Sequence, residues 1–255
     1  MPVVTLVPAR MASNRLKAKV LADIHGKPMI QHVLEGALKA NLGPVVLACD
    51  HPDIAAIGHK ISVATFLTDP DLPSGSDRIY QALQLFDPEK KYEKVINVQG
   101  DLPTLEASLI RSVLKPLEDP NVDMSTLAAV IQDKNEEENP NVVKIALAQK
   151  KKTSPGVTSQ EPSLDPIYRA LYFSRSCIPF GEGPHYHHIG LYGYQRNALD
   201  TFITLSPSRL EQQEKLEQLR ALEAGFQINV HLVETVPLGV DSQEDLDKAR
   251  SILSF

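Results

Sequence analysis

Short, continuously apolar runs alternate with segments of helical periodicity over the first 117 residues, and this alternation limits the possible folds more than any other pattern in the chain. The apolar runs predict buried strands at 3–7, 45–48, 63–67 and 94–98. The periodic segments predict helices at 28–41, 53–60, 76–86 and 105–117. Such an alternation is typical of a parallel sheet covered on both faces. We therefore expect an α/β fold with a doubly wound, mostly parallel sheet.

The pattern changes after residue 122. Further strands are predicted at 124–131, 142–148, 168–175, 187–195 and 227–233. A polar segment, 133–141, suggests a hairpin between the first two, and the Lys-, Ser- and Pro-rich segment 149–166 suggests a loop. Further helices are predicted at 198–203, 209–224 and 242–253, the last capped by Ser242 with Asp245 three residues on. We expect one domain over residues 1–255, with a smaller mixed β subdomain on its edge at about 124–195.

Composition excludes several classes of protein. A net charge of −6, 5% aromatic residues and no Trp argue against nucleic acid as a partner. No apolar run approaches the ~18 residues of a membrane span, and the N-terminal residues lack the basic region of a signal peptide. Cys49 and Cys177 lack metal-finger spacing and are interpreted as reduced, structural thiols. We expect a cytoplasmic protein without membrane insertion.

The first 22 residues contain Arg10, Arg15, Lys17 and Lys19 but no acidic residue. They lie between the first strand and the helix at residue 28, where ligands bind in open α/β sheets. This loop predicts a polyphosphate site, although it could be only a solvated basic loop. Neither GxxxxGK[ST] nor GxGxxG occurs, which argues against P-loop enzymes and nicotinamide dehydrogenases.

Two further motifs follow predicted strands. Asp101 ends the run NVQGD (97–101), where a carboxylate could hold a hard cation such as Mg²⁺ or could simply cap a turn. The run SGSDR (74–78) opens a predicted helix and could cradle a base or phosphate, with Arg78 as a fixed cation. A plain capping turn would explain the second motif equally well.

Nine segments, in order over about residues 3–250, resemble the sugar-acid cytidylyltransferases. They are PAR (8–10), NRLKAK (14–19), GKPMIQHV (26–33), SGSDR (74–78), NVQGD (97–101), YFSR (172–175), HHIGLYGY (187–194), EKLEQLRALE (214–223) and GVDSQEDL (239–246). The resemblance implies a nucleotide-diphospho-sugar transferase-like nucleotidyltransferase fold, a homodimer and Mg²⁺ dependence. It implies the reaction of CTP with 3-deoxy-D-manno-octulosonate (Kdo) to give CMP-Kdo and diphosphate, for lipopolysaccharide biosynthesis.

The resemblance also implies roles for individual residues. Those at the nucleotide would be Pro8, Ala9, Arg10, Arg15, Lys19, Ser74, Gly75 and Arg78. Those around the sugar acid would be Gln99, Arg175, His188, Tyr192, Glu217 and Gln218. Asp101 and Asp241 would hold the metal, and the catalytic set would be Arg10, Arg15, Lys19, Asp101 and Asp241.

Alternatives remain for the function and for single residues. The same chemistry could act on another 2-keto sugar acid, such as an 8-amino Kdo analogue or a sialic acid, and an inactive nucleotide-binding module is a further alternative. Glu217 could merely pair with Arg220, and Asp241 could merely precede a helix cap. The histidines at 185, 187 and 188 could suggest a transition-metal site, but Gly183-Pro184 marks a loop there and no cysteine is expected near them.

The chain departs from the resemblance at three places. Residues 17–20, Lys-Ala-Lys-Val, stand where many relatives have Pro-Gly-Lys-Pro. Leu102 follows Asp101 where Glu is common, and Phe180 replaces a usual Trp. None of these changes removes a residue assigned to the chemistry.

Overall fold

The computed structural model describes residues 2–13, 16–149 and 167–254, and these form two compact units. The first comprises Met1–Arg111, Leu191–Ile203 and Pro237–Phe255; the second comprises Ser112–Gly190 and Thr204–Val236. The second unit therefore begins before the expected subdomain and also takes in residues 204–236. The prediction for residues 150–166 lies outside the described residues.

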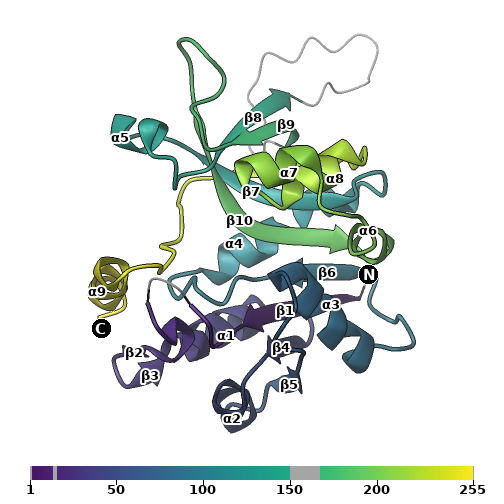
Figure 1. Ribbon diagram of the computed structural model, residues 1–255, viewed down its shortest axis with the longest axis vertical. Coiled ribbons are helices and arrows are strands. Elements are labelled where there is room, and N and C mark those ends of the chain that lie inside the picture. Colours follow the sequence, from purple (N-terminus) through teal and green to yellow (C-terminus); the bar gives the residue numbers. More distant parts are fainter. Residues whose placement is uncertain (1, 14–15, 150–166, 255) are drawn as a thin grey trace. The chain divides into compact units, whose positions relative to one another are not determined.

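The first unit is built on parallel strands (Figure 1). Their order is β5, β4, β1, β6, with the end of β10 antiparallel to β6. The strands are β1 (Val3–Ala9), β4 (Val45–Cys49), β5 (Ala64–Leu67), β6 (Lys94–Asn97) and β10 (Tyr186–Gln195). Every residue of β1 and β4 is buried, as continuous apolar runs require of central parallel strands.

Helices cover both faces of this sheet. The helices of this unit are α1 (Met29–Ala40), α2 (Pro52–Lys60), α3 (Gly75–Phe86), α4 (Ala107–Ser112), α6 (Arg196–Phe202) and α9 (Gln243–Ile252), with the short 3₁₀ helix η1 (Lys19–Leu21). The chain moves from β1 out to β4 and β5 and then returns to β6. Because parallel crossovers are right-handed, α1 and α2 lie on one face and α3 on the other. The expected doubly wound α/β fold is confirmed.

The second unit has mixed strands. They are β7 (Met124–Val130), β8 (Lys144–Gln149), β9 (Ile167–Ser174) and β11 (Ile228–Val233), together with the start of β10. β11 lies parallel to β7 and antiparallel to β9, and β9 pairs with β8. The other elements are the 3₁₀ helix η2 (Lys115–Glu118) and the helices α5 (Lys134–Glu138), α7 (Arg209–Glu214) and α8 (Gln218–Glu223).

Three element predictions are wrong in detail. The helix expected at 105–117 is split into α4 and η2, because Pro116 has no N–H for a continuous helix. The helix expected at 209–224 is split into α7 and α8 at Lys215, whose φ is 57°. The expected hairpin at 133–141 instead contains α5, and β7 pairs with β11 rather than β8.

One small element went unpredicted. β2 (Asp23–Ile24) and β3 (Lys27–Pro28) form a hairpin whose turn residues, His25 and Gly26, both have positive φ. Among the residues that the structure describes, helices long and apolar enough for a membrane crossing are absent.

Candidate active site

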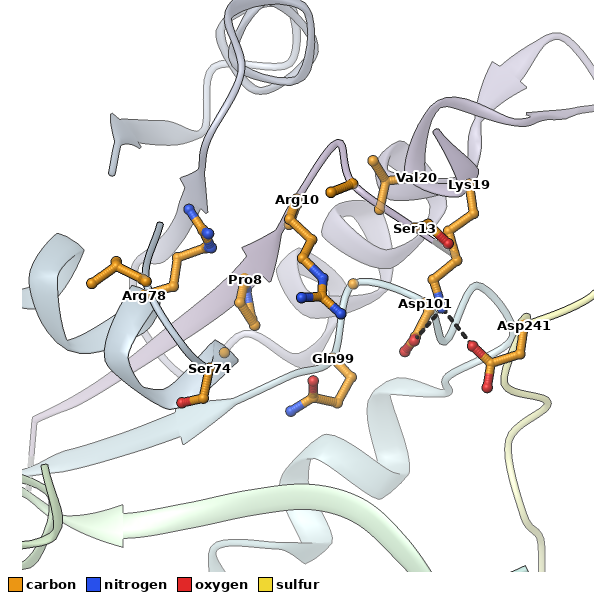
Figure 2. Close-up of a pocket in the computed structure, with 15 residues that line it drawn as sticks. Pro8, Arg10, Ser13, Lys19, Val20, Ser74, Arg78, Gln99, Asp101 and Asp241 are labelled. Atoms are coloured by element: carbon orange, nitrogen blue, oxygen red, sulfur yellow. Dashed lines mark hydrogen bonds and ion pairs between the residues drawn. The ribbon is translucent and has the colours of Figure 1, made fainter. Parts of the chain in front are cut away.

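A polar pocket of about 270 Å³ lies in the first unit, where β1 and β6 end and α3 begins (Figure 2). Its lining includes most of the residues predicted for the nucleotide and the metal. These are Pro8, Ala9, Arg10, Lys19, Ser74, Gly75, Arg78, Asp101 and Asp241. Arg15, the remaining predicted nucleotide residue, lies outside the described residues. The structure thus brings segments from both ends of the chain to one place.

The floor of the pocket depends on Gly100. A Cβ at this position would lie 2.5 Å from the carbonyl oxygen of Pro8 and 3.2 Å from Cδ1 of Ile30. The turn after β6 therefore packs directly on the end of β1, and only glycine permits this approach. This packing places Asp101 beside the basic loop that follows β1.

Lys19 joins the two carboxylates of the pocket. Its Nζ donates to Asp101 Oδ2 at 2.8 Å, to Asp241 Oδ1 at 2.7 Å and to the Val240 carbonyl at 3.0 Å. Burial by itself lowers the pKa of Lys19, but the two carboxylates outweigh this effect and raise the pKa above its ordinary value. Lys19 is therefore a permanent cation that uses all three of its hydrogen-bond donors.

The position of Asp241 is set by the start of α9. Ser242 and Asp245 form a capping box, and the Asp241 N–H donates to Asp245 Oδ2 at 3.2 Å. The Val240 N–H also donates to the Asp101 carbonyl at 2.9 Å. Ser242, rather than Asp241, thus caps the helix, as predicted, and the Asp241 carboxylate turns into the pocket (Figure 2).

The two carboxylates fit a divalent cation. Both point at a single nitrogen, and their side chains remain 35% and 48% exposed, so a cation from solvent can reach them. Mg²⁺ is usually held by one or two carboxylates together with substrate phosphates and water. Asp101 and Asp241 supply such a donor set, and the metal itself stays a prediction.

Other lining residues add donors for anions. Arg10 directly follows β1, and its guanidinium reaches into the pocket (Figure 2). Ser74 caps α3 by accepting from the N–H groups of Ser76 and Asp77, so the capping interpretation of this motif is confirmed. The start of this 12-residue helix still faces the pocket, where its dipole favours negative charge.

Arg78 lines the pocket, but its guanidinium turns into the protein. Nη1 donates to Thr68 Oγ1 at 2.6 Å and to the Asp69 carbonyl at 3.2 Å, and the residue is buried. Arg78 therefore ties the start of α3 to the segment after β5. Its predicted contact with the nucleotide stays a prediction.

The residues predicted for the sugar acid are divided between the units. Gln99 lines the pocket, and Tyr192 lies on β10 opposite Asn97, in the first unit. The other four belong to the second unit: Arg175, His188, Glu217 and Gln218.

In the second unit, Arg175 lies against the junction between α7 and α8. Its guanidinium donates to the carbonyls of Glu214 at 2.8 Å and Pro140 at 2.9 Å. Glu217 and Gln218 follow at the start of α8, and Gln218 Nε2 is buried without a hydrogen-bond partner among the described residues. Arg220, the alternative partner considered for Glu217, forms an ion pair with Glu211 on α7 at 2.6 Å.

His188 is a core histidine of the second unit. The Thr126 hydroxyl donates to the Ile189 carbonyl, so its oxygen accepts from His188 Nε2 at 3.0 Å. The ring packs edge-on against Phe173. Burial, with a smaller contribution from His187, lowers the pKa of His188 to about 3. The ring is therefore neutral, and its contact with a sugar stays a prediction.

Comparison with known proteins places the chain in a family. A sequence model described as Cytidylyltransferase matches residues 4–230. A 3-deoxy-manno-octulosonate cytidylyltransferase from Rhizobium meliloti (strain 1021) is 53% identical over 249 residues, which cover 98% of this chain and 94% of the relative. The chain belongs to the 3-deoxy-manno-octulosonate cytidylyltransferase family. The enzyme of the same name from Rhodopseudomonas palustris (strain BisB5) is also 53% identical, over 98% of this chain and 97% of the relative.

A solved structure agrees with this assignment to the cytidylyltransferase family. CMP:2-keto-3-deoxy-manno-octonic acid synthetase complexed with CTP is 33% identical, with a TM-score of 0.85, and the match covers 99% of this chain and 98% of that one. The resemblance seen in nine sequence segments and the fold that it implied are thereby confirmed.

Sequence reasoning missed some lining residues in this member of the cytidylyltransferase family. Ala12, Ser13, Val20, Leu72 and Gly100 also line the pocket. Gly100 lay inside a quoted motif, and Val20 lay in a segment noted only for departing from relatives. Their side chains carry little distinctive chemistry, so only the fold could reveal their place.

Proposed function

We propose that this chain transfers the CMP group of CTP to Kdo, releasing diphosphate and forming the CMP-Kdo used in lipopolysaccharide biosynthesis. The observation that carries the proposal is 53% identity, over nearly the whole chain, to 3-deoxy-manno-octulosonate cytidylyltransferases. The pocket supports it, because cationic and carboxylate groups meet there at the ends of parallel strands.

The proposed reaction is an in-line displacement at the α-phosphorus. The anomeric hydroxyl of Kdo attacks, a new P–O bond forms, the bond to diphosphate breaks, and the hydroxyl proton is lost to solvent. The burden on the protein is positioning and charge neutralisation. Arg10, Lys19 and the start of α3 would bind the triphosphate and stabilise charge on the leaving diphosphate, with Arg15 in the same role.

Asp101 and Asp241 would hold Mg²⁺. When bound, this ion supplies Lewis-acid stabilisation of phosphate charge and lowers the pKa of the attacking hydroxyl. Until then, Lys19 offsets part of the charge of the two carboxylates and holds them together. Lys19 can exchange these contacts for phosphate oxygens once the two aspartates have another cationic partner.

The sugar acid would be recognised by groups that suit its chemistry. Arg175 can offer a guanidinium to the carboxylate, and the buried Gln218 amide can donate to a hydroxyl. Gln99, His188, Tyr192 and Glu217 complete the proposed set. The resemblance also supports a homodimer in the cytoplasm, and size-exclusion chromatography with light scattering tests the dimer.

The test is diphosphate release from each of the four nucleoside triphosphates with Mg²⁺ and with Kdo, N-acetylneuraminate or 8-amino Kdo. We expect release with CTP and Kdo only, abolished by EDTA. Release with CTP and a different sugar acid would keep the chemistry and overturn the substrate. CTP binding without release under any condition would overturn the proposal in favour of an inactive nucleotide-binding module.

A further inference from the structure

A second cluster of potential ligands lies in the second unit, and none of its residues lines the pocket. One carboxylate oxygen of Glu137, the thiol sulfur of Cys177 and one ring nitrogen of His185 all lie within 4.8 Å of one another. Glu137 is on α5, Cys177 follows β9, and His185 directly precedes β10. The sequence led us to expect no cysteine near the histidines at 185, 187 and 188. For His185 this expectation is wrong, because the chain after β9 folds back on the start of β10.

His185 is held from both sides of its ring. Nε2 lies 2.9 Å from the Pro179 carbonyl, and Nδ1 lies 3.0 Å from Glu137 Oε1. A carbonyl only accepts hydrogen bonds, so Nε2 must carry a hydrogen. A neutral ring would then point the Nδ1 lone pair at a carboxylate.

Two groups of electron pairs cannot face each other at 3.0 Å without a positive charge between them. A proton is one solution, and the Glu137 hydrogen bond does raise the pKa of His185. A metal ion is the other. The thiol of Cys177 within the same cluster distinguishes the two solutions, because a proton does not need a third ligand and a soft metal does.

We infer that Glu137, Cys177 and His185 form a binding site for a borderline-soft divalent transition ion such as Zn²⁺. Thiolate, imidazole and carboxylate are its usual ligands, with water in the fourth position. The His185 bond to the Pro179 carbonyl is the outer contact that metal-bound histidines commonly make. Mg²⁺ is excluded here by its preference for oxygen ligands, so this site differs in chemistry from the Asp101–Asp241 pair.

The three ligand atoms need to move only slightly closer together to hold an ion. With Zn–S near 2.3 Å and Zn–N near 2.0 Å, tetrahedral ligand atoms are about 3.3–3.8 Å apart. Cys177 is exposed, so rotation of its side chain can bring the sulfur closer. Binding releases the thiol proton and the Nδ1 proton to solvent.

The bound ion would connect α5 to the segment after β9. Pro140, just beyond α5, accepts a hydrogen bond from Arg175, which lies two residues before Cys177. Metal binding would therefore fix the surroundings of Arg175. Any effect of the bound metal on the Michaelis constant for Kdo rests on the proposed function. Metal binding itself does not rest on it.

The test is titration of the full chain with Co²⁺, followed by competition with Zn²⁺. We expect one equivalent to bind with a thiolate-to-Co²⁺ charge-transfer band and visible bands of tetrahedral Co²⁺, and Zn²⁺ to abolish both. Cys177→Ser should lose the charge-transfer band, and His185→Gln should bind at least tenfold more weakly. Without metal, Cys177→Ser should unfold at the wild-type temperature because Cys177 is exposed, which separates lost ligation from lost folding.

Two matched controls complete the experiment. Cys49 is the other cysteine; it is buried, and burial raises its thiol pKa to about 11, so Cys49→Ala should keep the band. Asp101→Asn should also keep it, because its carboxylate belongs to the pocket. A band that persists in Cys177→Ser would overturn the inference. So would the absence of stoichiometric binding, which would leave only a proton between His185 and Glu137.

Discussion

At the scale of single residues, the pocket depends on one lysine between two aspartates. Lys19 lies at the start of the chain, Asp101 after the fourth parallel strand and Asp241 before the last helix. None of the three is adjacent to another in sequence, yet the single positive charge of Lys19 contacts both carboxylates. Loss of the Lys19 charge would therefore leave two negative charges close together.

Asp101→Asn and Asp241→Asn should each slow diphosphate release from CTP and Kdo by about 100-fold or more, because several kcal/mol of charge stabilisation is lost with the metal. Both should need more Mg²⁺ for half-maximal rate. Asp247→Asn is the matched control, since that carboxylate is exposed on α9 and pairs with Arg250. Initial rates across a Mg²⁺ series measure the effect, and wild-type rates for Asp101→Asn would contradict the assignment.

His188 should make stability depend on pH. Its folded-state pKa is about 3 and its ordinary value is 6.5, so the unfolded chain takes up the proton first as pH falls. The stabilisation is present above 6.5 and is lost progressively as pH falls toward 3. Between about pH 7.5 and about pH 5, the loss should be about 2 kcal/mol.

His188→Gln tests this linkage. The amide can still donate to Thr126 but does not titrate, so its unfolding free energy should fall less over the same pH range. Urea unfolding at both pH values measures the difference. The pKa of His185 is raised, so this residue changes the pH dependence of stability in the opposite direction. Because it does so in both the wild type and His188→Gln, its contribution cancels in the comparison. Equal pH slopes for the two proteins would contradict the prediction.

At the scale of elements, the loop before η1 carries local backbone strain. Ala18 has φ 51° and ψ 37°, a left-handed conformation that costs an L-residue about 1–2 kcal/mol. In the family pattern that the sequence resembles, glycine stands at this position. The departure noted in the sequence therefore falls on a residue whose conformation favours glycine.

Ala18→Gly should stabilise the protein by up to about 1 kcal/mol, because relief of strain exceeds the added entropy of the unfolded chain. Ala22→Gly, at the other end of η1 with φ −58°, has no such strain to relieve and should destabilise by about 0.5–1 kcal/mol. Chemical denaturation measures both. Equal destabilisation by the two changes would show that Ala18 is unstrained.

Two capping boxes offer a matched pair of variants. Ser242 and Asp245 cap α9 beside Asp241, whereas Ser208 and Glu211 cap α7 in the second unit. Ser242→Ala and Ser208→Ala should each cost about 1 kcal/mol of stability. Only Ser242→Ala should also slow diphosphate release several-fold, because the same Asp245 oxygen holds the Asp241 backbone. Equal rates of diphosphate release in the two variants would show that the cap of α9 does not position Asp241.

Most elements could be predicted because their apolar periods are strong. The run that became β4 has no polar interruption, those that became β1 and β6 are mostly apolar, and Ser242 with Asp245 marked the start of α9. The errors came where tertiary structure decides: Lys215 adopts a left-handed conformation without glycine, and β7 pairs with β11, about a hundred residues away, instead of the nearer β8. A single sequence contains no local signal for either outcome.

At the scale of the whole molecule, every described residue that lines the pocket belongs to the first unit. The motifs of the nucleotide site were recognisable because their residues are chemically distinctive. The convergence of Cys177, His185 and Glu137 was not recognisable, because it depends on how the chain returns after β9. Distinctive side chains reveal a site only when their spacing is familiar.

CTP with Mg²⁺ should protect the first unit from hydrogen exchange. Protection should appear at 8–13, 72–78, 99–101 and 240–246, which contain or adjoin the pocket lining. The strands β9 and β11 in the second unit should change only after a Kdo analogue is added. Exchange followed by mass spectrometry resolves these segments, and protection of β9 and β11 by CTP alone would contradict the assignment.

If Lys19 and Asp241 act as proposed, their contact also sets the point in translation at which the chain can become active. A ribosome that has produced residues 1–101 has already delivered β1, the basic loop and the first aspartate, but Lys19 still lacks its second partner. All of the second unit is translated before Asp241 emerges. The proposed chemistry therefore starts only after Asp241 has been translated, and a chain shorter than this would not consume CTP before its residues for the sugar acid exist.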